Sequence, residues 1–395
     1  MAVTSPAFAR DRSTLLLYAA LGVFGCLQVV PGLVTPALRD ELGYGYTLAS
    51  LHVSAFAGLG VVAGIAAPAL DRRYGRRALL VVGLVGLALA AGALTLGRTP
   101  TTTLAAAGVA GLLGTLVLVA VQSALSDHHG EQRAVAFAES NVVASLGQTG
   151  APIVVGAAAA VLGSWRWGVV ALAATGLLVA LAARGRAVPS LLHDGELTDA
   201  GGPLPSAART GVALVFASVA LEWSVSYWGA TYLREVVGLA RATAVAAMAC
   251  FFGAMLVGRF ASGLLVRRHH AARLMAYGLV VVAAGVMLQG VSTATVPALA
   301  GLLLLGLGIA ALFPLGLALA VGAAPLRSTA VSGRCVVAGS GAVLLGPLVV
   351  GQVADGIGLR PALVAVPVLA VVATALLVRL VHLQPVGEPT GGPAR

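Results

Sequence analysis

Residues 67–77 read APALDRRYGRR, and four of these eleven residues are arginine. Only 10% of the residues in the whole chain are charged. A cluster this dense marks a point where an apolar segment ends and the chain enters water. The stretch separates two apolar runs, 46–69 and 78–97, and runs of this kind organise the rest of the sequence.

The composition excludes an ordinary soluble protein. Of 395 residues, 59% are hydrophobic, and the mean hydropathy is +0.99, whereas soluble domains carry about 25% charged residues. We therefore predict a membrane protein. The net charge of +10 comes from arginine alone, without a basic domain that interleaves aromatic side chains, so we expect no nucleic-acid partner. Cys26, Cys250 and Cys335 lie inside apolar runs and indicate neither a disulfide framework nor a metal site, and we expect no cofactor.

Twelve apolar runs are long enough to cross a bilayer, which needs about 20 mostly apolar residues. Six precede a polar stretch at 185–208, and six follow it. The runs cover approximately 14–36, 46–69, 78–97, 101–125, 134–162, 165–184, 209–232, 241–266, 273–292, 296–323, 328–354 and 360–382. The polar stretch holds three acidic residues and three prolines, so we interpret it as a linker between two halves.

The distribution of arginine predicts the orientation, because positively charged residues favour the cytoplasmic side. With a cytoplasmic N-terminus, sixteen of the 24 arginines fall in cytoplasmic loops and tails, and two lie inside runs. The six arginines left for the outer loops are Arg39, Arg98, Arg166, Arg234, Arg241 and Arg360. We predict that both termini face the cytoplasm and that the protein is a multi-pass protein of the inner cell membrane.

The two halves are related by an internal repeat with an offset of 195 residues. Arg72–Arg73 recurs as Arg267–Arg268, and APIVVG at 151–156 recurs as GPLVVG at 346–351. Six spans followed by six more keep the same orientation, so the halves should be related by an axis along the membrane normal.

On these motifs the sequence resembles the major facilitator superfamily over essentially its whole length. The stretch at 67–77 is similar to the family's loop signature after the second span, with Ala67 in place of a glycine and one extra residue before Gly75. GRFASGLLVRR at 258–268 resembles the copy in the second half. GQTGAPIVVG at 147–156 and SWRWG at 164–168 are similar to motifs of the family's proton-driven exporters, although the fourth-span arginine of those exporters is missing.

The resemblance implies an all-α membrane fold of 12 transmembrane helices in two pseudo-symmetric six-helix bundles. Residues 1–184 would form the N-terminal bundle, 185–208 a cytoplasmic linker, and 209–395 the C-terminal bundle with a short tail. We expect the protein to act as a monomer.

Glu222 is the carboxylate nearest to mid-bilayer. It lies about 20 Å along the run 209–232, at 1.5 Å per residue. Ionisable groups at such depth cost about 2.5–3.5 kcal/mol on insertion scales and usually serve a function. The resemblance places this span at a central cavity, where a lone carboxylate can take up and release a proton. We predict that Glu222 couples transport to protons, and a hydrogen-bonded structural glutamate is the alternative.

Polar and aromatic residues near Glu222 are candidates for the cavity wall. On the helix of residues 220–233, Ser226 and Gly229 share a stripe with Glu222. Candidate side chains that contact the substrate are Gln28, Glu139, Asn141, Trp223, Ser226 and Tyr227.

Three further charges lie two turns or less from a cytoplasmic helix end: Glu139, Arg259 and Arg334. The repeat maps Glu139 onto position 334, so equivalent sites carry opposite charges. The resemblance implies that Glu139 faces Arg259 and Arg334 faces Asp71 in an outward-facing state. Snorkelling to the membrane surface is the alternative for Arg259. The predicted cytoplasmic gate consists of Asp71, Arg76, Arg77, Asp127, Arg259 and Arg334, with Asp127 holding Arg76 or Arg77.

Together these observations predict a secondary active transporter of a small organic solute, coupled to protons, with efflux or antiport favoured over import. The alternative is a proton symporter that imports a sugar- or carboxylate-like nutrient. With no lysine in the chain, a Gly-Lys phosphate-binding loop is excluded, so uphill transport would need an ion gradient. An enzyme would need convergent nucleophile, base or metal ligands, and the sequence offers none. We therefore expect the protein not to be an enzyme.

The predicted topology can be tested with cysteine labelling at Ser206. In a background in which Cys26, Cys250 and Cys335 are replaced, Ser206→Cys should react with a membrane-impermeant maleimide only from the cytoplasmic side, because the linker is predicted to lie there. Labelling of intact cells against inverted vesicles measures this. Reaction from the outside would refute the topology.

Overall fold

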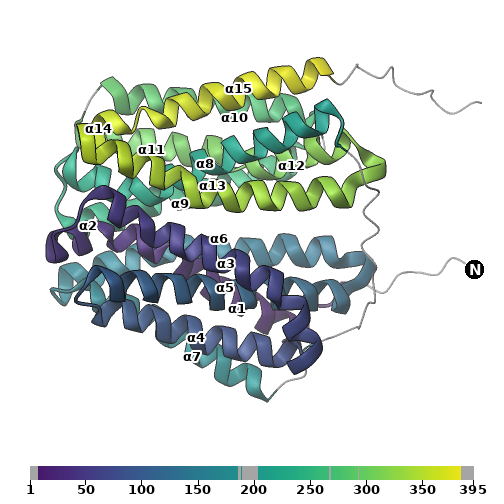
Figure 1. Cartoon of the computed structure of the whole chain (residues 1–395), viewed down its shortest axis with the longest axis horizontal. Helices are drawn as coiled ribbons and strands as arrows, with labels where there is room; N and C mark the ends of the chain where they lie inside the picture. The colour runs from purple at the N-terminus through teal and green to yellow at the C-terminus, as the bar shows by residue number, and fades with distance from the viewer. Residues whose placement is uncertain (1–7, 186–187, 189–202, 267, 292, 384–395) are drawn as a thin grey trace, which may run out of the picture.

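The computed structural model describes residues 8–185, 188, 203–266, 268–291 and 293–383, and the regular elements in these ranges are all helices. Two bundles lie against each other, α1 to α7 below and α8 to α15 above (Figure 1). Arg186, Arg267, Arg395 and most of the linker predicted at 185–208 fall outside the described residues. The exact bounds of the linker therefore stay a prediction.

The predicted spans appear as helices. The first bundle holds α1 (Arg12–Gln28), α2 (Val30–Leu42), α3 (Tyr46–Tyr74), α4 (Arg76–Leu96), α5 (Pro100–His129), the 3-10 turn η1 (Gly130–Gln132), α6 (Arg133–Val161) and α7 (Trp165–Arg184). The second holds α8 (Ser206–Glu235), α9 (Arg241–Leu265), α10 (Ala271–Val291), α11 (Thr295–Ile309), α12 (Leu312–Gly322), η2 (Pro325–Arg327), α13 (Ser328–Ile357), α14 (Leu359–Ala362) and α15 (Ala365–Leu383).

Within the described residues, 12 helical stretches are long and apolar enough to cross a membrane. They coincide with the twelve predicted runs, so the prediction of a twelve-span, all-α fold is confirmed. The largest difference is at the end of the first run, predicted near residue 36, where helix continues to Leu42. Arg39, Asp40 and Glu41 end the apolar run but do not end the helix.

Three spans are broken, and each break has a proline two to four residues after it. The first span divides at Val29 before Pro31, the tenth at Ala310–Ala311 before Pro314, and the twelfth at Leu363–Val364 before Pro367. Proline cannot donate to the carbonyl four residues earlier, and its ring clashes with that carbonyl. Proline chemistry therefore accounts for all three breaks.

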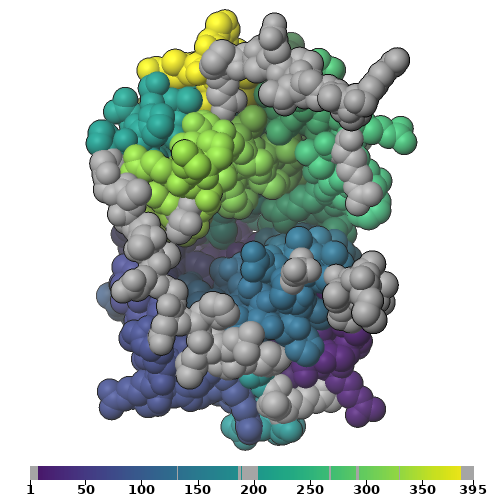
Figure 2. All heavy atoms as spheres, turned by 90° about the vertical axis from the view of Figure 1, so that its right-hand side faces the viewer, coloured from purple at the N-terminus to yellow at the C-terminus, as the bar shows by residue number. Residues whose placement is uncertain are grey.

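The two ends of the bundles differ in how closely the halves approach. We call the end with Arg12, Tyr74, His129 and Leu383 the inner side, following the predicted orientation, and the opposite end the outer side. The inner side lies at the right of Figure 1. Figure 2 shows this inner face, where a hollow separates the two bundles. The contacts between the bundles described below lie in the outer half and middle of the molecule.

Two helix pairs, α6 with α9 and α3 with α13, bring the bundles together on the outer side. A Cβ added at Gly156 of α6 would lie 2.8 Å from the carbonyl oxygen of Ala242 on α9. A Cβ added at Gly351 of α13 would likewise lie 2.8 Å from the carbonyl oxygen of Tyr46 on α3. These glycines are the matched pair of the 195-residue repeat. The repeat therefore gives each half one helix whose glycine allows backbone-to-backbone contact with the other half.

We predict that filling these two contacts opens the outer side. Gly156→Ala with Gly351→Ala places methyl groups against fixed backbone, and overpacking of this kind costs about 1–3 kcal/mol. An energy of this size shifts a two-state equilibrium roughly five- to 150-fold. In the background without native cysteines, Val53→Cys, at a side chain that is 2% exposed, should then be labelled faster from outside by an impermeant maleimide.

Gly150→Ala with Gly356→Ala is the matched control, because these glycines lie on the same two helices and have nothing within 4 Å of an added Cβ. The control should leave the labelling rate unchanged. Equal rates in both double variants would contradict the role of the two contacts.

Candidate functional site

An ion pair lies in the middle of the molecule, between α8 and α9. Nη2 of Arg259 lies 3.2 Å from Oε1 of Glu222. The Glu222 side chain is 16% exposed and that of Arg259 34%. Glu222 is 13 residues, or about 20 Å, from the outer end of α8. Since α8 begins at Ser206, 16 residues before Glu222, the pair lies close to the middle of this span.

Arg259 also reaches the other bundle. Its Nη1 donates to the hydroxyl of Ser145 at 3.0 Å and to Oε1 of Gln148 at 3.5 Å, both on α6. The close packing of α6 on α9 makes this possible. One guanidinium group therefore joins the carboxylate of its own bundle to two neutral acceptors of the opposite bundle.

The expectation that Glu222 is a lone carboxylate is wrong, because Arg259 is its partner. Arg259 lies six residues before the end of α9, at Leu265, as expected from the sequence. Its long side chain spans the distance from that level to Glu222. The position of each residue along its helix follows from the sequence. Which groups come into contact depends on the length and direction of the arginine side chain, which the sequence does not show.

Four of the six candidate cavity residues line one small cavity between the bundles. Gln28, Trp223, Ser226 and Tyr227 share it with Val29, Pro31, Gly32 and Val53. Its volume of about 10 Å³ is close to the minimum that holds one water molecule. The hydroxyl of Thr35 donates to that of Tyr227 at 3.0 Å, and the Tyr227 hydroxyl donates to the carbonyl of Ala49. The cavity is thus closed by contacts that join the two halves.

The other two candidates, Glu139 and Asn141, lie nearer the inner end of α6. Glu139 accepts hydrogen bonds from Arg10, with Nε at 2.9 Å, and from the hydroxyl of Tyr18 at 3.2 Å. The exposed amide of Asn141 donates to the carbonyl of Phe137 on its own helix. Neither residue lines the small cavity.

The arginine cluster after α3 forms a compact ion network within the first bundle. Arg76, 7% exposed, lies between two carboxylates, with Asp71 at 2.9 Å and Asp127 on its other side. The predicted contact of Asp127 with Arg76 or Arg77 is thus present, through Arg76. Arg77 donates to the carbonyl of Arg184. The network ties the inner ends of α3, α4 and α5 together.

The predicted pairs across the inner side are not formed in this arrangement. Glu139 contacts Arg10 instead of Arg259, and Asp71 contacts Arg76 while Arg334 is exposed. The physical reason is the hollow on the inner side (Figure 2), which keeps the two bundles apart there. The prediction concerned a state with the inner side closed, and for that state it stays a prediction.

Ion pairs across the outer side complete the contact between the bundles, and sequence reasoning missed them. Arg39 lies 2.9 Å from Glu235, and Asp40 lies 2.6 Å from Arg241. The Tyr46 hydroxyl donates to Glu235 at 2.6 Å. The signal in the sequence was opposite charge at the outer ends of spans from different halves, but nothing in the spacing says which ends meet.

A carboxylate of the second bundle also caps a helix of the first. Asp355, near the end of α13, accepts hydrogen bonds from the backbone amides of Tyr46 at 2.7 Å and Thr47 at 2.9 Å. The N-cap of α3 is Gly45, which offers no side-chain acceptor. Asp355 therefore supplies the acceptor that α3 lacks.

Comparisons with known proteins agree on one family and one fold. The sequence profile described as "Major Facilitator Superfamily" matches residues 15–333. No curated protein matches this chain. A solved bacterial homologue of the human lysosomal transporter Spinster, inward-facing and occupied, superposes with a TM-score of 0.79 at 14% identity, over 96% of this chain and 98% of that one. Its inward-facing, unoccupied form superposes with a TM-score of 0.68 at 16% identity, over 96% of this chain and 95% of that one. A mutant of the nucleoside transporter NupG superposes with a TM-score of 0.72 at 14% identity, over 94% of this chain and 100% of that one.

Proposed function

This chain belongs to the major facilitator superfamily, and we propose that it is a proton-coupled transporter that moves a small organic molecule across the inner cell membrane as a monomer. The observation that carries the coupling proposal is the Glu222–Arg259 pair, whose guanidinium also contacts Ser145 and Gln148 of the opposite bundle. A titratable group at the contact between two moving halves can link its protonation to their motion.

Protonation of Glu222 would change the contacts of Arg259. An arginine stays charged at any physiological pH, and removing one partner of a buried ion pair leaves the other charge without compensation. Ser145 and Gln148 offer only neutral acceptors. A protonated Glu222 would therefore release Arg259 toward another anion, either Glu139 or an acidic group of the substrate. Both alternatives change how α9 holds α6.

The small cavity supports a substrate site between the bundles. Gln28, Trp223, Ser226 and Tyr227 combine hydrogen-bonding groups with aromatic surface, and they come from both halves. At about 10 Å³ the cavity is too small for an organic molecule in this arrangement. The substrate would therefore bind when the halves separate at this level, with Glu139 and Asn141 nearer the inner mouth. The fifth-span motif at 147–156 supports export.

Alternating access would exchange the outer contacts for the predicted inner gate. Asp71 uses only Oδ2 to hold Arg76, and within the described part of the chain its buried Oδ1 has no hydrogen-bond partner. That oxygen could accept from Arg334 once the inner side closes. Glu139 would exchange Arg10 for Arg259 in the same step. The proposal of this gate is supported by the acceptor oxygen of Asp71 that has no hydrogen-bond partner.

We expect Glu222→Gln to separate coupled transport from exchange. The amide mimics the protonated carboxyl group, so net transport driven by a pH gradient in proteoliposomes should be abolished, whereas exchange of substrate, which needs no net proton movement, should persist. Screening a panel of small compounds for substrate-induced proton flux supplies the substrate and records the direction of coupling.

Glu41→Gln is the matched control, because Glu41 pairs with Arg166 inside the first bundle at the outer side. It should keep gradient-driven transport. If Glu222→Gln also keeps full gradient-driven transport, Glu222 is structural and coupling falls to Glu139, Asp71 or another cation.

A charge exchange tests the inner gate. Arg334→Ala should impair transport, because it leaves Asp71 without its partner in the outward-facing state. Asp71→Arg combined with Arg334→Asp should restore part of the transport rate. Asp127→Arg combined with Arg334→Asp is the control, since Asp127 also holds Arg76 but is not predicted to meet Arg334. If Asp71→Arg combined with Arg334→Asp transports no faster than either single variant, direct pairing of Asp71 with Arg334 is refuted.

A further inference from the structure

A second cavity lies inside the C-terminal bundle, apart from the Glu222–Arg259 pair. Its volume is about 240 Å³, and its lining comes from α8, α10, α11 and the broken last span, α14 and α15. No residue of the proposed proton or substrate site lines it. Leu363 and Val364, where the last span breaks, belong to the lining, so the proline-induced break shapes the wall of the cavity.

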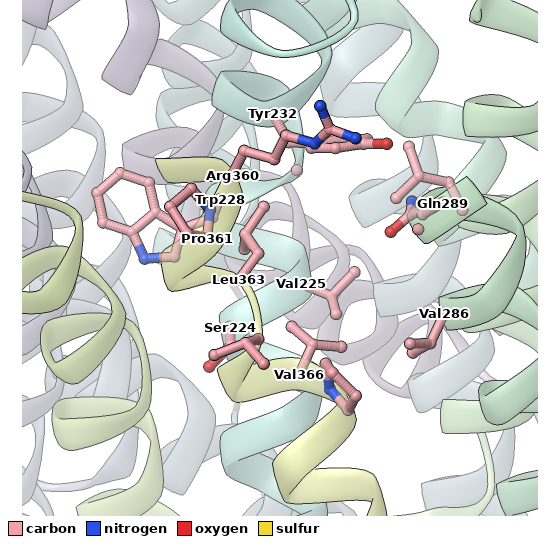
Figure 3. A pocket seen from close by; sticks show the side chains of 15 residues that line it. Ser224, Val225, Trp228, Tyr232, Val286, Gln289, Arg360, Pro361, Leu363 and Val366 are labelled. Carbon is pink, nitrogen blue, oxygen red and sulfur yellow. The ribbon is translucent and has the colours of Figure 1, made fainter. Parts of the chain in front are cut away.

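The cavity is polar at its outer end and apolar inside. Figure 3 shows Arg360 and Tyr232 at one end, with Gln289 nearby. Val225, Val286, Leu302, Leu363 and Val366 form the interior. Ser224 lies eight residues before Tyr232 on α8, which places it about 12 Å deeper.

Hydrogen-bond donors in this cavity lack acceptors. Within the described part of the chain, the hydroxyls of Ser224 and Tyr232 and Nε2 of Gln289 are buried without a hydrogen-bond partner. Ser224 is fully buried, and Tyr232 is 6% exposed. Buried donors of this kind are normally satisfied. The donors of Tyr232 and Gln289 lie at the same end of the cavity as Arg360 (Figure 3), and they therefore indicate a ligand that supplies acceptors there.

The charged residues that line the cavity indicate whether the ligand is an anion or a cation. Arg360 is exposed at the mouth, and none of the described residues that line the cavity is acidic. A carboxylate offers acceptors only and forms short, charge-assisted hydrogen bonds with a guanidinium. The outer end of the cavity therefore suits an anionic oxygen group, while the interior suits a hydrocarbon chain.

The position of the cavity indicates where the ligand comes from. The helices α10 and α15 lie at the edge of the molecule furthest from the first bundle (Figure 1), a surface that faces lipid in a membrane. The exposed residues Gly290, Pro361 and Val364 line the opening. A depth of about 12 Å is within one leaflet of a hydrocarbon core about 30 Å thick. A ligand can therefore enter sideways from the outer leaflet.

We propose that this cavity is a binding site for a single-chain aliphatic carboxylate of the outer leaflet. The carboxylate contacts Arg360, Tyr232 and Gln289, and the chain occupies the apolar interior toward Ser224. The site shares no residue with the proposed transport pathway, so its test does not depend on the outcome of the proton-coupling test.

The test measures binding of tritiated laurate to the full chain in phosphatidylcholine nanodiscs. We expect saturable binding that Arg360→Gln weakens about tenfold, the loss of one charge-assisted hydrogen bond. Arg98→Gln, at an exposed outer-side arginine of the first bundle, is the matched control and should bind like the unmodified chain. Unlabelled acetate, which lacks the chain, and dodecanol, which lacks the charge, should compete poorly.

Filling the cavity provides a second variant. Val286→Trp should abolish laurate binding, and its melting temperature reports whether the bundle stays folded. Because Arg360 is exposed, Arg360→Gln leaves the packing of the bundle intact. If Val286→Trp unfolds, laurate binding by Arg360→Gln alone tests the proposal. The proposal is overturned if laurate does not bind saturably, if Arg360→Gln binds it with unchanged affinity, or if acetate competes as well as laurate.

Discussion

The contact of backbone with backbone at Gly156 and Gly351 is the constraint on which the arrangement of the two bundles depends. Lipid gives helices no hydrophobic reason to associate, so close van der Waals packing through small residues has to hold them together. The contacts at Gly156 and Gly351 both lie in the outer half of the interface. The ion pairs of Arg39 with Glu235 and of Asp40 with Arg241 follow, because the glycine contacts bring these helix ends within reach.

Charge at membrane depth is handled differently at the two levels of the molecule. At the inner side, Arg76 is neutralised by two carboxylates of its own bundle, so that cluster can stay intact whatever the second bundle does. In the middle, Arg259 divides its donors between Glu222 and the opposite bundle. The first arrangement lies within one bundle, whereas the second connects Glu222, through Arg259, to α6 of the other bundle.

The sequence predicted those features that depend on position along a helix. The twelve spans follow from apolar run length, and the repeat that contains Gly156 and Gly351 follows from residue offset. Gln28 and Tyr227 line one small cavity, and their contact with a substrate stays a prediction. The contact of Arg259 with Glu222 was not predicted, because helix depth says nothing about the direction of a long, flexible side chain. The outer ion pairs were missed because they join chain segments whose proximity only the packed bundles determine.

The cap that Asp355 places on α3 has a consequence for how the protein is made. Tyr46 and its acceptor are 309 positions apart, so the second span leaves the ribosome long before the residue that completes its first turn exists. Until the eleventh span is inserted, the amides of Tyr46 and Thr47 have no side-chain acceptor from Gly45 and must be satisfied by water or lipid headgroups. The outer end of the first bundle therefore reaches its final hydrogen bonding only when synthesis is nearly complete, and a first half produced alone would lack it.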